Sequence, residues 1–486
     1  MGVLVRLALA LSIAMFAYEV QAEREQYVGG EDVTLIVRLV NDSPSAVEVP
    51  DPAAPSDAFK YYIVGPQYPE GKVFSSAGAP TQLISIAPHS TEARRVALGR
   101  IAELSLHGDY RLMSQLEWQG TKVRSRESSF RIEAVKPVSI HLGYGTRPLG
   151  NGEGEGAFID RDAGSAQLYS FQYLETHPGI GEAQLKAPVA RLALAPGATD
   201  VSVPWTNTPF FGELIRWTLW REGRSIKALS NSSRTPLSFD LAEDVAYLVR
   251  PPLKPASEPV EVLALSQDGK KVSLVRMGTT QQKPGSLAWS LPLPAKAHSI
   301  TARLAPQALG SRRHIALVAK TGDGLEIFHS RYAAQAAPEP FRSVRVRGAE
   351  PMDNASVELF VDAAGIAHVG VLAMLDKATN TAGIVEARFA EGPGSVSQPA
   401  TATLGALGAA PVGGALLYVD KEGKLARQDI VIALQDGRVV RTDSARRLAP
   451  ASVPGTLTLP ILLAPGKEAT YILFLNPQRG LSLERL

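Results

Sequence analysis

The chain has no cysteine among its 486 residues. This absence excludes disulfide bonds, thiol catalysis, thiolate metal sites and a lipid anchor on an N-terminal cysteine. An exported protein without disulfides is held together by packing alone. The composition therefore fits a bacterial envelope better than an animal extracellular space.

The chain also lacks a long apolar run beyond its N-terminus and an excess of one charge. No later segment approaches the ~18 consecutive apolar residues of a spanning helix, so we expect no transmembrane segment in the mature chain. The formal net charge is +2, and lysine and arginine are dispersed along the sequence. A nucleic-acid partner is not expected, because such proteins concentrate their basic residues in a patch.

Local catalytic signatures are missing as well. The sequence has no Gly-x-Ser-x-Gly elbow, no Walker loop and no zincin helix. None of the eight histidines pairs with another at i+2 or i+4, the spacings that favour a local metal site. We therefore assign no catalytic residue, no metal site and no cofactor, and the sequence favours a non-enzymatic protein.

The first 22 residues have the pattern of a secretory signal peptide. Arg6 precedes an apolar stretch at 7–18, and Val20 and Ala22 place small residues at −3 and −1 of a cleavage site. The interpretation predicts a secreted or periplasmic protein after cleavage near Ala22. The alternative is an uncleaved anchor, for which the stretch is short.

Residues 23–137 carry short alternating apolar segments divided by turn residues, which predicts an antiparallel β-sandwich. The segment GDYRLMSQLEW (108–118) places a Gly-x-Tyr before a late strand. In this respect the stretch resembles immunoglobulin-like domains, and the resemblance implies that Tyr110 forms a tyrosine corner. Residues 138–162 are rich in glycine and are interpreted as a solvated linker. Their Gly152-x-Gly154-x-x-Ala157 spacing is not a dinucleotide site, because Glu153 and Glu155 would repel phosphates and no helical period follows.

From 163 to 486, hairpin turns recur at intervals of about 40 to 57 residues, as at Glu222-Gly223, Asp268-Gly269 and Asp323-Gly324. Flanking strands such as HIALVAK are apolar on both faces, as expected when sheets pack on both sides. This pattern resembles the β-propeller superfamily and implies six or seven four-stranded blades. The predicted fold is thus all-β, an immunoglobulin-like sandwich followed by a propeller, with tandem β-sandwiches as the alternative.

The most aromatic region, TPFFGELIRWTLW, supplies the candidate ligand-binding residues. Trp217 and Trp220 are three apart, so a straight strand points them to opposite faces, one toward the core and one outward. An exposed tryptophan near Arg216 or Arg221 could stack on a sugar or anchor a partner. The alternative is ordinary core packing. His314, His329 and His368 could converge on a propeller axis, or be half-buried strand residues.

Three functional hypotheses remain open. The first is an exported, non-catalytic binding or scaffolding protein of the bacterial envelope that acts through protein–protein interaction. The second is a carbohydrate-binding or glycoside-cleaving propeller with a polysaccharide partner. The third is a structural surface protein that self-assembles. Propellers host both enzymes and binders, so the fold does not choose among them.

Overall fold

The computed structural model describes the chain in two compact units. The first extends to Val135 and includes Ala187–Val189 and Asn476–Leu481, and the second comprises the remaining residues from Lys136 onward. Each unit is described separately. The described residues are all except 1–15, 76–81, 103, 105, 145–152, 163–164, 178–181, 186–187, 204–205, 208–216, 231–232, 250–253, 256–259, 281–282, 306–311, 334–335, 391–395, 422–423, 443–446, 460, 466–468 and 477–479.

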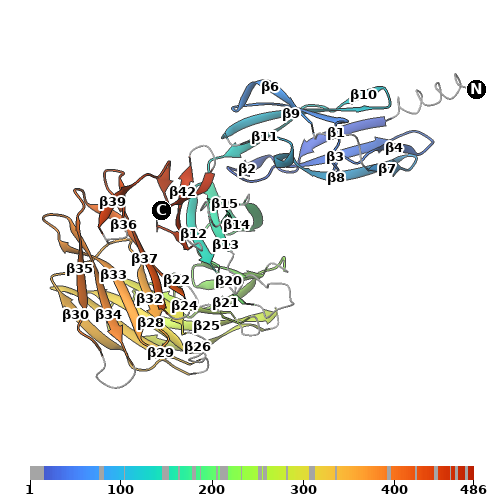
Figure 1. Ribbon diagram of the computed structural model, residues 1–486. Helices are drawn as coiled ribbons and strands as arrows, with labels where there is room; N and C mark the ends of the chain where they lie inside the picture. The colour runs from blue at the N-terminus through green and yellow to red at the C-terminus, as the bar shows by residue number, and fades with distance from the viewer. Residues whose placement is uncertain are drawn as a thin grey trace, which may run out of the picture. The chain divides into compact units, whose positions relative to one another are not determined.

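The first unit contains three sheets and one 3₁₀ turn, Leu98–Arg100 (Figure 1). One sheet has the order β1 (Phe16–Ala22), β3 (Thr34–Asn41) and β8 (Ser90–Ala97). The largest has the order β2 (Gln26–Val28), β11 (Ser128–Glu133), β9 (Gly108–Trp118), β5 (Phe59–Gly65) and β6 (Tyr68–Phe74), with β10 (Thr121–Arg124) also on β9. The third pairs β4 (Val47–Pro50) with β7 (Leu83–Ile86).

One hydrophobic core joins the two larger sheets of this unit. Alternate residues of β3, including Leu35 and Val37, pack in the same cluster as Phe59 of β5 and Leu112 of β9. Tyr110 at the start of β9 donates a 2.7 Å hydrogen bond from Oη to the carbonyl of Leu106. A tyrosine corner has this back-bond to a residue a few positions upstream. The immunoglobulin-like assignment of the unit stays a prediction.

The signal-peptide boundary expected at Ala22 coincides with the end of strand β1. Residues 16–22 form β1, which pairs with β3 from Phe16–Asn41 to Ala22–Leu35. Tyr18 is buried, and its hydroxyl lies 2.7 Å from Ser114 Oγ. Residues 16–22 are thus a strand of the first sheet in this structure, and cleavage near Ala22 stays a prediction. Residues 1–15 lie outside the described part of the chain.

The second unit is a series of antiparallel sheets, here called blades and numbered in chain order. Blade 1 contains β12 (Pro137–Tyr144), β13 (Glu153–Asp162), β14 (Ser165–His177) and β15 (Glu182–Leu185), with β16 (Val189–Leu194) on β14. Blade 2 contains β17 (Ala198–Ser202), β19 (Trp217–Glu222), β20 (Ser225–Ser230) and β21 (Leu237–Asp240). Blade 3 contains β22 (Val245–Val249), β24 (Glu261–Ser266), β25 (Lys271–Thr280) and β26 (Lys283–Pro292).

The series continues toward the C-terminus. Blade 4 contains β27 (Ser299–Leu304), β28 (Arg313–Lys320), β29 (Gly324–Tyr332) and β30 (Arg342–Arg347). Blade 5 contains β31 (Glu350–Pro351), β32 (Val357–Val361), β33 (Ala367–Asp376), β34 (Thr381–Phe389) and β35 (Ala400–Ala406). Blade 6 contains β36 (Pro411–Lys421), β37 (Lys424–Leu434), β38 (Val439–Thr442) and β39 (Leu448–Ala451). Blade 7 contains β40 (Thr456–Leu457), β41 (Leu463–Pro465), β42 (Thr470–Asn476) and β43 (Gly480–Arg485), and β18 (Thr206–Asn207) pairs separately with β23 (Lys254–Pro255).

The blades close into a ring. One strand of each blade contacts the corresponding strand of the next, in the order β12, β17, β22, β27, β32, β36 and β41, and β41 contacts β12 again. Figure 1 shows the cyan strands of blade 1 beside the red C-terminal strands. A closed ring of antiparallel sheets is a β-propeller, here with seven blades, which confirms the predicted fold class over tandem sandwiches.

Hydrophobic clusters fill the spaces between consecutive blades. Along β28, Ile315 and Leu317 pack toward blade 3, whereas Ala316 and Val318 pack toward blade 5. Successive side chains of a strand point to opposite faces, so a strand between two neighbours must be apolar throughout. The segments chosen from the sequence as apolar on both faces are therefore inner strands of blades.

The predicted linker at 138–162 is wrong, because its described part consists of strands of blade 1. β12 pairs with β13, and β13 pairs with β14 along its whole length. Gly154 and Gly156 face aromatic rings of β14, so a Cβ would lie 1.9 Å from Tyr173 and 2.0 Å from Phe171. The glycines make room for these rings, and the rings cover the exposed backbone.

The hairpin predicted at Asp268-Gly269 is present between β24 and β25. Gly269 has φ +70°, Asp268 is not among the residues with positive φ, and Gly269 N donates to Ser266 O at 2.9 Å. This combination is a type I turn followed by a left-handed glycine, which also matches the strand twist. A type I′ turn would need positive φ at both central residues.

Candidate functional site

The two candidate tryptophans lie on opposite faces of β19. Trp220 is 1% exposed in the core between blades 1 and 2, and its Nε1 donates to Glu222 at 2.9 Å. Trp217 is half-buried and packs on the cluster between blades 2 and 3. The spacing of three thus gives the opposite orientations expected from the sequence. Trp220 takes the core position.

Arg221 connects two blades. Its Nε donates to Asp200 Oδ2 at 2.6 Å, and its Nη2 donates to the carbonyl of Ala246 in blade 3 at 2.9 Å. Burial raises the pKa of Asp200, and the Arg221 guanidinium opposes that rise. Arg161 donates in the same way from blade 1 to Ala198 O of blade 2, at 2.8 Å. Arg221 therefore occupies a repeated structural position.

Among the described residues, the structure does not gather the predicted ligand-binding set at one surface. Trp220 is in one core, Trp217 faces another, and Arg221 is paired. Arg216 lies outside the described residues. A ligand role for these residues stays a prediction.

The strand histidines have hydrogen-bond partners within their own blades. His314 Nδ1 lies 3.0 Å from His329 Nε2 on the neighbouring strand of blade 4. Burial lowers the pKa of His314 to about 4 and that of His329 to about 2, and the Arg342 charge adds to both shifts. His368 Nε2 instead lies 3.1 Å from Asp362 Oδ2. These are the hydrogen-bonded strand histidines of the alternative interpretation.

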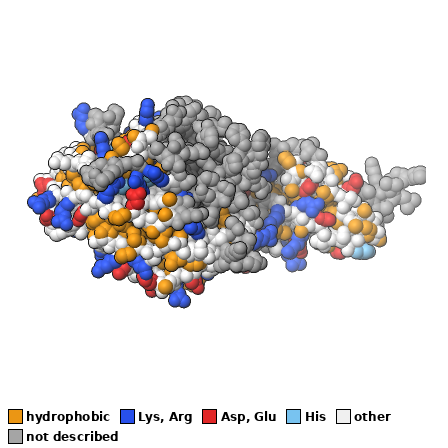
Figure 2. Space-filling model, turned by 90° about the horizontal axis from the view of Figure 1, so that it is seen from below, with side chains coloured by type: hydrophobic (Ala, Val, Ile, Leu, Met, Phe, Trp, Pro, Cys, Tyr) orange, Lys and Arg blue, Asp and Glu red, His pale blue; other side chains and the backbone are white. Residues whose placement is uncertain are grey.

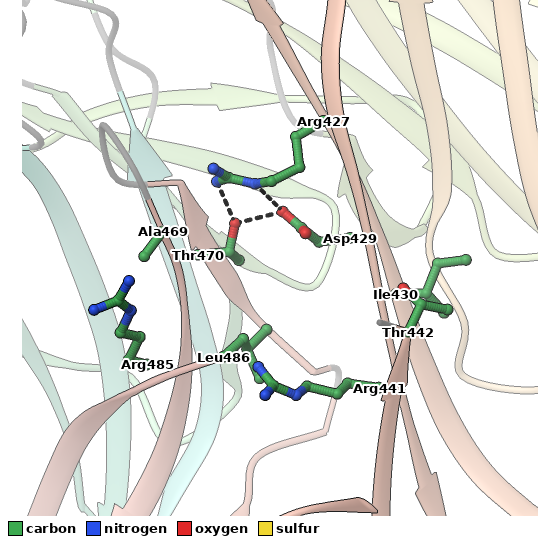
Figure 3. A pocket seen from close by; sticks show the side chains of 9 residues that line it. All are labelled: Arg427, Asp429, Ile430, Arg441, Thr442, Ala469, Thr470, Arg485 and Leu486. Carbon is green, nitrogen blue, oxygen red and sulfur yellow. Dashed lines mark hydrogen bonds and ion pairs between the residues drawn. The ribbon is translucent and has the colours of Figure 1, made fainter. Parts of the chain in front are cut away.

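A small pocket lies between blades 6 and 7, with a volume of about 120 Å³. Its lining comes from β37, β38, β42, β43 and the residue after β43 (Figure 3). We call it the arginine pocket, after the residues that give it its character, which are Arg427, Asp429, Arg441, Thr470, Arg485 and Leu486.

One side of the arginine pocket is a closed hydrogen-bonded group. Arg427 donates from Nε to Asp429 Oδ2 and from Nη2 to Thr470 Oγ1, each at 2.6 Å. Thr470 Oγ1 in turn donates to Asp429 Oδ2 at 2.5 Å. The alternation of β37 places residues 427 and 429 on one face, and Leu486 N donates to Thr470 O at 2.8 Å. This group holds the Arg427 guanidinium in a fixed orientation.

The opposite side of the pocket carries Arg441 and Arg485. Arg441 comes from β38 and is half-buried, and its side chain has no hydrogen bond or ion pair with any residue that the structure describes. Arg485 comes from β43 and is exposed. Asp429 is the one acidic side chain in this fully described lining. The arrangement can hold an anionic group, since guanidinium forks match carboxylate and phosphate oxygens.

Sequence reasoning missed the arginine pocket. Its residues are far apart in the chain, from 427 to 486, and they meet only because β42 and β43 form the sheet beside blade 6. The one local signal for the pocket is the spacing of Arg427 and Asp429, because residues two apart in a strand lie on the same face.

Within the described ranges, no group of three or more histidine, aspartate and glutamate side chains could hold a metal ion. In the same ranges, no helix has the length and apolar character needed to cross a membrane.

The closed ring of antiparallel sheets makes the chain an all-β protein of the β-propeller type. No protein-family model matches the sequence, and no curated protein matches it. The chain is similar in structure to BBS1N, solved in complex with ARL6DN, at 14% identity and a TM-score of 0.40, covering 73% of this chain and 93% of that one.

Two further solved structures are similar to it. The lectin of Aleuria aurantia shares 10% identity at a TM-score of 0.39, with 66% of this chain and 97% of that chain covered. The periplasmic gluconolactonase of Pseudomonas aeruginosa shares 16% identity at a TM-score of 0.37, with 72% and 95% covered. At these scores the fold assignment rests on the strand pairing described above.

Proposed function

We propose that the chain is an exported, non-catalytic binding protein of the bacterial envelope that acts through protein–protein interaction. The arginine pocket carries this proposal. Its volume of about 120 Å³ is well below the roughly 300–1,000 Å³ of sites that enclose a small molecule. A pocket of this size admits a single side chain or charged group, as a binding surface for a larger partner does.

The described surface of the propeller supports the same function. Four large hydrophobic side chains are exposed in the second unit, namely Val138, Leu287, Leu425 and Leu459. On the face seen in Figure 2, hydrophobic side chains gather among lysine, arginine and acidic residues. Protein interfaces combine an apolar centre with a polar rim, and arginine is enriched in them.

The test is affinity capture with the chain from Phe16 to Leu486, immobilised and exposed to an envelope extract of the source organism. Bound proteins are identified by mass spectrometry against a heat-unfolded control. We expect one protein to be enriched reproducibly and, after its own purification, to bind the chain saturably in calorimetry.

Other outcomes overturn the proposal. Retention by a polysaccharide fraction, with no protein enriched, replaces it by the carbohydrate-binding hypothesis. Oligomers that grow with protein concentration in light scattering, again without a second protein, replace it by self-assembly. Recovery of the protein only from the cytoplasmic fraction of the source cells overturns export.

A further inference from the structure

We propose that the arginine pocket binds one carboxylate group of an acidic segment in the protein partner, with Arg441 as its direct contact. The inference rests on the proposed function, and it names the chemistry by which the partner would be recognised. It follows from the states of Arg427 and Arg441, the charge of the lining and the size of the pocket.

Arg427 and Arg441 are in different states. Arg427 already uses two donors on Asp429 and Thr470, so it is oriented before any ligand arrives. Arg441 is half-buried and has no partner in the part of the chain that is described. A partly desolvated guanidinium without an acceptor is unfavourable, so an incoming carboxylate gains an interaction that the described residues do not supply. A guanidinium can bind both oxygens of that carboxylate at once.

The charge of the lining favours an anion. Arginines from three strands surround the pocket, which attracts an anion. Asp429 nevertheless lies within the same lining, and its oxygen accepts from both Arg427 and Thr470. A phosphate carries close to two negative charges near neutral pH, so the arginines attract it more, and Asp429 repels it more, than a carboxylate of single charge. Titrations with peptide and with phosphate decide between the two anions.

The pocket volume favours an acidic side chain of a protein over an acidic sugar. About 120 Å³ holds a carboxylate and its methylene stem, as in aspartate or glutamate. The carboxylate of a uronic acid is attached directly to its ring, so the ring would have to enter the pocket with it. Burial of an oriented charge pair at an interface gives specificity for the partner.

The test uses the full chain and a defined probe, the peptide acetyl-Gly-Glu-Glu-Glu-Gly-amide, in calorimetry at low salt. The same peptide with glutamine in place of glutamate measures the contribution of charge. Sodium phosphate and an oligogalacturonate test the competing anions. We expect saturable binding of the glutamate peptide, at least tenfold weaker binding of the glutamine peptide, and weaker binding of both competing anions.

Arg441→Gln is the informative variant, and Arg438→Gln is its matched control. Arg438 is exposed on the neighbouring turn, where its Nε donates to Asp436 at 2.7 Å, and it does not line the pocket. We expect Arg441→Gln to weaken peptide binding at least tenfold and Arg438→Gln to change it less than twofold. Arg441→Lys keeps the charge without the fork and should bind with intermediate strength. A thermal melt of each variant checks that it is folded.

Equal peptide binding by wild type and Arg441→Gln overturns the inference, as does tighter binding of phosphate or oligogalacturonate. The proposed function is judged separately. If Arg441→Gln still captures the same envelope protein with the same affinity, the chain is a protein binder and the pocket is not its contact. If no envelope protein is captured by wild type, the proposed function fails even where the peptide binds.

Discussion

Individual buried polar side chains form ion pairs between neighbouring blades. Glu261 of blade 3 accepts from Arg276 at 3.1 Å and from Arg313 of blade 4 at 2.9 Å. Arg313 is 0% exposed, so its charge is fully desolvated and depends on this carboxylate. Such contacts fix which blade packs on which, since the hydrophobic faces alone are chemically alike.

The His314–His329 pair predicts a loss of stability in mild acid. The pKa values of both histidines are lowered by burial, to about 4 and about 2, from the ordinary value near 6.5. The unfolded chain therefore binds more protons below pH ~6.5 than the folded chain does. The stability is fully present above that pH and falls as the pH decreases, by up to about 1.4 kcal/mol per pH unit for each histidine.

Urea denaturation between pH 7 and pH 5 measures this dependence. The variant His314→Gln removes one titrating group, and the slope of the free energy of unfolding against pH should decrease accordingly. Most carboxylates titrate below this window, which isolates the histidines. An unchanged slope in the variant would contradict the assignment.

The tryptophans of β19 give a matched pair of substitutions. Trp220→Ala leaves a cavity in the core between blades 1 and 2, and we expect it to lower the free energy of unfolding by about 3–5 kcal/mol. Trp217→Ala removes a half-buried ring and should cost less. Chemical denaturation followed by far-ultraviolet circular dichroism checks both. Equal losses would show that the two rings are not in the different environments described here.

Strand β13 shows, at the scale of the element, why a linker was expected from the sequence. Glycine normally weakens strands and indicates loops, and GNGEGEG contains little else that identifies a strand. The missing information is the partner strand, because Phe171 and Tyr173 of β14 cover the glycines. The segment GDYRLMSQLEW, which has its own alternation and was expected to contain a late strand, is observed as β9 (Gly108–Trp118). The sequence therefore predicts a strand reliably where the strand itself contains alternating apolar residues, and fails where the apolar groups come from a neighbouring strand.

Strand β1 gives a prediction about where the folded first unit begins. A chain starting at Glu23 lacks Phe16, Tyr18 and Val20, whose side chains are buried in the first core. It also leaves one edge of β3 without the pairing that runs from Phe16 to Ala22. We expect its thermal midpoint to be lower than that of a chain starting at Phe16, by several degrees or more. Equal midpoints would mean that β1 does not contribute to the folded unit.

The closed ring is a property of the whole molecule, and only part of it could be predicted from sequence. The recurring Asp-Gly turns indicate repeated hairpins, and the doubly apolar strands indicate sheets packed face to face. The number of blades does not follow from them, because β40 and β41 are very short and no Asp-Gly turn marks blade 7. The arginine pocket was missed for the same reason, since it exists only where blade 7 packs beside blade 6.

Ring closure predicts an effect across more than 300 residues of sequence. Deletion of residues 456–486 removes β41, which contacts both β36 and β12. Both β36 and β12 then lose the strand that covers them. Amide hydrogen exchange should therefore accelerate in β12 as well as in β36, relative to β28 of blade 4. In an open series of sheets, the deletion would expose blade 6 and leave β12 unchanged. Acceleration confined to β36 would therefore contradict the closed propeller, whereas acceleration in both strands requires the contact between the first and last blades.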